Sequence, residues 1–172
     1  MNNHCHEIGI PAHLHQNSRP QAPQFDEKEL LYRRFFVHPP KSAWLGKENR
    51  HKSAKIFHLE NDSYNRSKFS QKPEDVLFNI NAQSPEDHFG NWGVLSIEVA
   101  DLQGLVVPAE INGETGSVTF QPVHKPETCM YPHSEIHAFR NGAFIPEVAP
   151  KSVRAIVRDI LVEICGILKE PE

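Results

Sequence analysis

The stretch Gly93-Val94-Leu95-Ser96-Ile97-Glu98-Val99 carries the clearest strand pattern in the chain. Its aliphatic side chains at positions 95, 97 and 99 alternate with Ser96 and Glu98. Side chains of a strand point alternately to the two faces of a sheet, so this alternation predicts one apolar face and one polar face. A sheet built around this strand is therefore expected at the centre of the fold.

A second pattern follows near the C-terminus, from Val153 to Leu168. Apolar residues recur there at i, i+3, i+4 and i+7, which predicts an amphipathic helix whose apolar stripe packs on the 93–99 strand. Further strands are expected at residues 31–38, 54–59 and 118–123. This order of elements predicts the α+β class, with an antiparallel or mixed sheet and the C-terminal amphipathic helix packed on one face.

Length and composition place the chain among globular proteins. It has 172 residues, of which 38% are hydrophobic and 23% charged, and its formal net charge is −4. Residues 1–24 are rich in histidine and lack an apolar period, so a flexible His-rich N-terminal tail is expected there. An alternative is a strap that lies over the domain. Residues 25–172 are expected to form a single α+β domain.

The cysteines indicate whether the protein works in a reducing or an oxidising compartment. Cys5, Cys129 and Cys165 are far apart and odd in number, which is not the pattern of a disulfide framework. The N-terminus lacks the basic and apolar regions of a secretory signal, and no apolar run reaches the roughly 18–20 residues of a membrane helix. These features favour a cytoplasmic protein without a membrane partner.

The segment 133–137 offers candidate metal ligands. Read as a strand, it places His133, Glu135 and His137 on one face. Zinc and other divalent metals accept imidazole, carboxylate and thiolate ligands, so His124 and Cys129 are candidates to complete a site. Such a site would suit a small metal-dependent, nuclease-like hydrolase. The alternative is a polar strand that faces solvent.

A different constellation has the order found in ADP-ribosyltransferases. Arg33 and Arg34, either of which could serve, lie on an early strand, Ser67 and Ser70 in a middle segment, and Glu135 on a late strand. The resemblance implies that an arginine holds the phosphates of NAD and that Glu135 stabilises positive charge on the ribose. The chain departs from the pattern where His133 stands in place of the usual Glu or Gln, and the middle segment lacks Ser-Thr-Ser.

A third candidate is a recognition surface. The 41–68 region concentrates positive charge and aromatic side chains on an otherwise acidic chain, with Trp44, Lys47, Arg50 and Arg66 as candidate partner-binding residues. Basic side chains interleaved with aromatic ones suit a protein partner, and they would also allow nucleic acid to bind through this basic region.

The stretch from Leu31 to Gly142 resembles a group of short, uncharacterised bacterial proteins. The matching pieces are Leu31-Tyr32-Arg33-Arg34, Asn65-Arg66-Ser67 with Pro73-Glu74-Asp75, and Pro132-His133-Ser134-Glu135-Ile136. The resemblance implies a single-domain bacterial protein of the cytosol and supplies no activity. The leading expectation is a non-catalytic binding or accessory protein of a bacterial cytosolic system, which engages a macromolecular partner. The hydrolase is the alternative, so whether the chain is an enzyme stays open at this stage.

Overall fold

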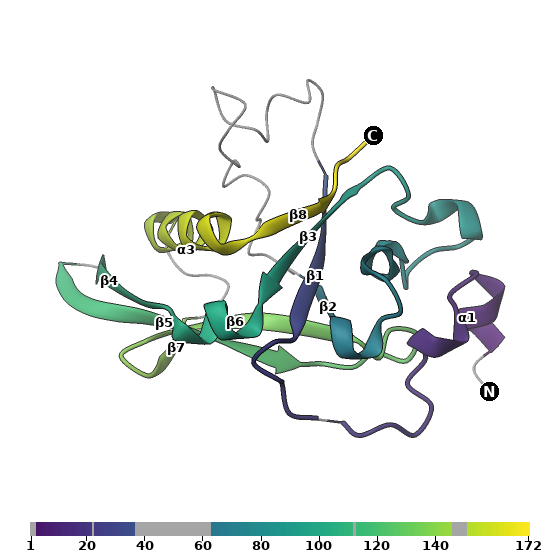
Figure 1. Ribbon diagram of the computed structural model, residues 1–172, viewed down its shortest axis with the longest axis horizontal. Coiled ribbons are helices and arrows are strands. Elements are labelled where there is room, and N and C mark those ends of the chain that lie inside the picture. Colours follow the sequence, from purple (N-terminus) through teal and green to yellow (C-terminus); the bar gives the residue numbers. More distant parts are fainter. Residues whose placement is uncertain (1–2, 22, 37–62, 112, 146–150) are drawn as a thin grey trace.

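The computed structural model describes residues 3–21, 23–36, 63–111, 113–145 and 151–172. Their strands form one antiparallel, open sheet in the order β4-β5-β6-β2-β1-β3-β8, with β7 paired to β6 (Figure 1). The strands are β1 (Leu30–Phe35), β2 (Tyr64–Arg66), β3 (Gly93–Glu98), β4 (Val106–Ile111), β5 (Glu114–His124), β6 (His133–Arg140), β7 (Ala143–Ile145) and β8 (Gly166–Lys169). The helices are α1 (Asn3–Glu7), α2 (Val99–Gly104) and α3 (Lys151–Ile164), with short 3-10 turns η1 (Ala12–Leu14), η4 (Ser67–Phe69), η5 (Pro73–Leu77) and η6 (Pro85–Asp87). A mixed fold with an antiparallel sheet and few helices is confirmed.

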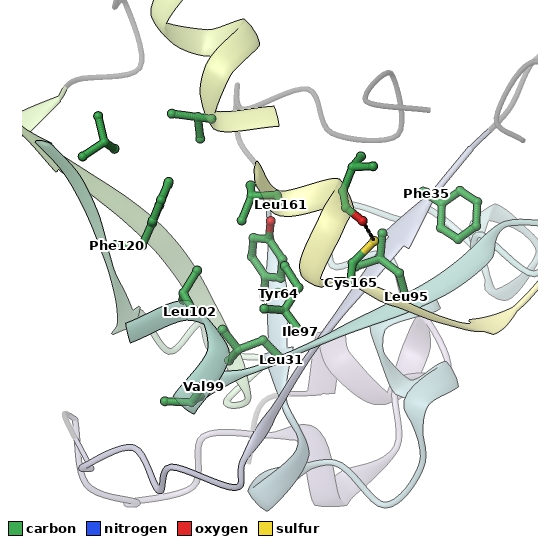
Figure 2. Packing of buried hydrophobic residues seen from close by; sticks show 13 residues of the cluster. Leu31, Phe35, Tyr64, Leu95, Ile97, Val99, Leu102, Phe120, Leu161 and Cys165 are labelled. Atoms are coloured by element: carbon green, nitrogen blue, oxygen red, sulfur yellow. Dashed lines mark hydrogen bonds between the residues drawn. The ribbon is translucent and has the colours of Figure 1, made fainter. Parts of the chain in front are cut away.

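The main core lies between the sheet and α3 (Figure 1). Leu95 and Ile97 of β3 are fully buried, and so is Leu161 of α3 (Figure 2). The 93–99 strand is thus confirmed up to Glu98, where the chain turns into α2. Because Val94 packs with Val76 on the other side, both faces of β3 are covered at the centre of the sheet.

Strand β1 follows the expected alternation. Leu31 and Phe35 point into the main core, whereas Tyr32 packs on the opposite side of the sheet. The strand ends earlier than expected, at Phe35. The 54–59 segment, expected as a strand, lies outside the described residues.

The sequence predicts a C-terminal helix that extends to Leu168, but the helix in the structure is shorter. Helix α3 ends at Ile164, and Gly166–Lys169 instead forms β8, which pairs antiparallel with β3. Leu168, assigned to the helical stripe, is 47% exposed on this strand. Gly166 weakens a helix at this point, and pairing with β3 satisfies the backbone hydrogen-bonding groups of the residues that follow. Cys165 is buried at the junction, takes no part in a disulfide, and donates from its Sγ to the carbonyl of Val162.

The N-terminal segment differs most from expectation, because its residues 3–21 pack on the domain. Ile8, Ile10 and Leu14 are almost fully buried, together with Cys5. They contact an apolar cluster formed by Phe78, Ile80, Ala82, Cys129 and Met130. The strap alternative therefore describes this segment better than a flexible tail.

Replacing Leu161 with alanine is expected to lower the free energy of unfolding by about 3 kcal/mol, because it leaves a cavity between α3 and the sheet. Urea denaturation measures the change. Glu163→Ala is a matched control on the exposed side of α3 and should shift the value by less than about 0.5 kcal/mol. Equal effects of the two substitutions would contradict this packing.

Candidate functional site

The 133–137 segment forms the start of β6, as expected. Ile136 and Ala138 pack against the main core under α3. Since side chains alternate along a strand, His133, Glu135 and His137 point to the opposite, outer face of the sheet. The predicted shared face is confirmed, although Ile136 is half-buried rather than fully buried.

The three polar residues are engaged with neighbours inside the protein. His133 is buried, and its Nδ1 lies 2.6 Å from the carbonyl oxygen of Lys125 while its Nε2 lies 3.2 Å from the Oγ of Ser63. The ammonium of Lys125 lies 2.7 Å from Glu135, and the Nε2 of His137 lies 3.0 Å from the same carboxylate oxygen. The arrangement is a Lys–Glu–His ion-pair group beside a hydrogen-bonded histidine.

The electrostatics of Glu135 follow from these contacts. Burial raises the pKa of its carboxyl, but hydrogen bonds from Lys125 and His137 lower it more strongly. The net pKa lies below its ordinary value, so the carboxylate is ionised at neutral pH and balanced by its own neighbours.

His124 and Cys129 do not join this group. His124 pairs across the sheet with Ser134, so it points to the α3 side while His133 points outward. Cys129 forms a disulfide with Cys5, which removes the thiolate that a metal would need. Within the described residues, no three His, Cys, Asp or Glu side chains are placed to hold a metal ion.

The arginines and Glu135 are also separated. Arg33 lies on the core face of β1 with Leu31 and Phe35, opposite to the face of Glu135. Arg34 lies on the outer face, donates to the carbonyl of Val76 at 3.2 Å and stacks on Phe89 at 4.3 Å. Strand β2 separates β1 from β6. The ADP-ribosyltransferase-like constellation is not brought together.

The expected recognition surface falls largely on residues 41–62, so Trp44, Lys47 and Arg50 lie outside the described residues. Arg66 corrects the expectation, because its side chain is fully buried and cannot meet a partner at the surface.

Arg66 instead forms a buried network of an ion pair and hydrogen bonds, a role that the sequence did not predict. Its Nε and Nη2 donate to the two oxygens of Glu29 at 2.7 Å each, and further bonds reach the carbonyls of Pro23 and Gln24. The guanidinium also stacks on Phe25, at 3.7 Å. Glu29 lies 37 positions away in the chain, so no local pattern marks this pair.

His124 lies near Arg66, and its ring contacts those of Phe69 and Tyr131, with centroids 5.9 and 5.0 Å away. Neither ring nitrogen has a hydrogen-bond partner among the described residues. Burial, reinforced by the charge of Arg66, lowers the pKa of His124 from 6.5 to about 4. The imidazole is therefore neutral at physiological pH and serves as a packed aromatic ring.

The lowered pKa of His124 makes the stability of the fold depend on pH. Between pH 6.5 and about 4 the unfolded chain binds a proton at His124 that the folded chain does not, so stability falls as the pH falls through this window. His124→Phe keeps an aromatic ring and removes the proton site. Urea midpoints measured from pH 7 to pH 4 should therefore fall less steeply for His124→Phe than for the parent.

The matched control is Val106→Phe, which adds an aromatic ring at an exposed position without changing a titratable group and should keep the slope of the parent. A parent-like slope in His124→Phe would show that this histidine does not contribute to the pH dependence.

A surface pocket of about 380 Å³ lies over the 85–92 segment. Phe89 and Trp92 supply aromatic walls, and the exposed carboxylate of Glu86 lies at its edge. His88 also lines it, but its Nδ1 accepts from the Asn79 amide and its Nε2 binds the Ile8 carbonyl. None of the residues singled out from the sequence lines this pocket.

Within the described residues, no helix is both long enough and apolar enough to cross a bilayer. Comparisons with protein-family models, with curated proteins and with solved structures find no match to this chain.

Proposed function

We propose that the chain is a non-catalytic binding protein that engages a protein partner through the outer face of β5, β6 and β7. The observation that carries the proposal is a pair of phenylalanines on this face. Phe144 is 50% exposed and lies opposite Phe139 in the β6–β7 pairing, with the two rings 5.9 Å apart. Neither ring belongs to a buried cluster of the described residues.

Several contacts support Phe144 as an anchor. His137 stacks beside it, with ring centroids 4.9 Å apart, and Glu135 holds that imidazole in place. Lys125 is half exposed at the border of the same face. An aromatic centre held in place by its neighbours and bordered by charged groups has the composition of a protein-binding surface.

The proposal is tested by photo-crosslinking. Benzoylphenylalanine replaces Phe144 in one sample and Leu168 in another, because Leu168 is similarly exposed, at 47%, on the far edge of the sheet. We expect a discrete adduct from position 144 that is absent from position 168. The partner identified by mass spectrometry is then purified, and its affinity for the unmodified chain is measured.

Phe144→Ala should weaken that affinity at least tenfold, and Leu168→Ala should change it less than twofold. Such a tenfold loss corresponds to about 1.4 kcal/mol. Identical adducts from both positions, or equal effects of the two alanine variants, would refute the proposal.

For the compartment, we propose a setting that is oxidising enough to keep Cys5 and Cys129 paired, in place of the reducing cytoplasm expected from the sequence. The support is the buried disulfide, since such bonds persist mainly outside reducing compartments. Thiol titration of denatured, freshly isolated protein should count one free cysteine, and a count of three would contradict this. Nucleic-acid binding through residues 41–68 stays an untested prediction.

A further inference from the structure

We infer that the Cys5–Cys129 disulfide is a redox latch, which keeps the strap (residues 3–21) docked over an apolar surface of the domain. The inference concerns a different part of the molecule from the proposed partner surface and does not depend on it. The strap lies at one end of the sheet, beside the 73–92 segment (Figure 1).

Besides the disulfide, the strap contacts the domain through apolar side chains and through separate polar contacts. Three apolar side chains, Ile8, Ile10 and Leu14, enter the cluster below it. Its helix α1 has five residues, and helices this short are not stable by themselves in water. The apolar contacts must therefore offset the entropy of ordering a long stretch of backbone.

Polar contacts attach the strap at separate points. The Nε2 of His13 lies 2.8 Å from the buried carboxylate of Asp75. The Ile8 carbonyl accepts from His88 at 2.8 Å, and the Leu14 carbonyl accepts from the amide of Tyr131. Each such bond replaces one that water could make, so its net contribution is modest.

The disulfide changes this balance because it joins the strap covalently to the cluster that it covers. Cys5 lies in α1, and Cys129 lies next to Met130 of that cluster. A covalent link keeps Ile8, Ile10 and Leu14 at high effective concentration over their contact surface. Docking of the strap is therefore expected to depend on the oxidised state.

The opening step requires a dithiol reductant. One thiolate of the reductant attacks the Sγ of Cys129, a residue that is 7% exposed whereas Cys5 is fully buried. Cys5 leaves as a thiolate that takes up a proton. The second thiol of the reductant then displaces the Cys129 sulfur, which is also protonated, and closes the reductant's own disulfide. Two electrons and two protons pass to the protein.

Release of the strap uncovers a surface that is closed in the oxidised protein. It would expose the apolar side chains on which the strap lies, which are Phe78, Ile80, Ala82 and Met130. The latch thereby couples the redox state to the exposure of this apolar surface.

Hydrogen exchange followed by mass spectrometry tests the latch on the full chain. The oxidised protein is compared with the same protein after reduction by dithiothreitol and with Cys5→Ser. In both latch-free forms, the amides of residues 8–16 should exchange at least tenfold faster than in the oxidised protein, at a rate that low urea concentrations leave unchanged. The amides of β3 and β5 also lose protection as the whole domain becomes less stable, but their exchange still depends on urea because it requires global unfolding. Binding of the apolar dye bis-ANS should rise in parallel. Cys165→Ser, which removes the thiol that takes no part in the disulfide, should behave like the parent.

Two results would overturn the inference. In the first, residues 8–16 keep their protection after reduction, so the strap docks without the latch. In the second, exchange in the strap depends on urea as steeply as exchange in β3, so the strap opens only when the whole domain unfolds and the bond does not control the strap separately. If Cys5→Ser does not fold, the dithiothreitol-treated parent, which was folded before reduction, decides between these outcomes.

Discussion

Reduction of the Cys5–Cys129 disulfide is expected to lower the free energy of unfolding by about 4–5 kcal/mol, the largest effect of any single change considered for this chain. The bond joins residues 124 positions apart, so its loss greatly increases the conformational freedom of the unfolded chain. Urea denaturation of the oxidised and reduced protein measures the difference.

Cys165→Ser serves as the control for this experiment. It should show the same gap between oxidised and reduced protein, because the thiol that it removes takes no part in the disulfide. Coincident urea curves for the oxidised and reduced parent would show that the disulfide contributes no stability.

Replacing Arg66 with methionine is expected to cost about 4 kcal/mol, because it leaves the carboxylate of Glu29 buried without its counter-charge. The change also removes the donors to the Pro23 and Gln24 carbonyls. Urea denaturation again gives the measurement. The exposed pair Lys68–Asp26 is the control, and Lys68→Met should cost less than about 1 kcal/mol.

The double variant Glu29→Met/Arg66→Met separates burial of a lone charge from loss of packing. It should recover part of the stability lost in Arg66→Met, since no unpaired charge then remains inside. A double variant that is less stable than Arg66→Met would mean that the carboxylate of Glu29 is accommodated without Arg66.

Local patterns predicted the parts of the fold that depend on neighbouring residues. The alternation in 93–99 identified β3, and that in 133–137 identified β6 and its outer face. The apolar stripe predicted helix α3, but it did not predict that the helix ends at Ile164. Whether Gly166–Lys169 continues a helix or pairs as a strand depends on the free edge of β3, about 70 positions earlier in the chain.

The contacts of the strap could not be predicted in this way. Its apolar residues are sparse and follow no period, and their partners lie in distant segments: His13 bonds to Asp75, 62 positions away, and Cys5 to Cys129. The candidate metal site failed for a related reason. Alternation placed His133, Glu135 and His137 correctly, but their hydrogen-bond partners, which come from other segments, decide their roles.

The disulfide also determines how force would travel through the molecule. The bond encloses β1 to β5, whereas β6, β7, α3 and β8 lie outside the closed loop. If the two chain ends are pulled apart, tension crosses the Cys5–Cys129 bridge and bypasses the enclosed strands. About 400 Å of chain inside the closed loop then cannot be extended by the applied force until the bond is reduced. The oxidised molecule can lose its C-terminal strands under load and still retain most of its length as a closed ring.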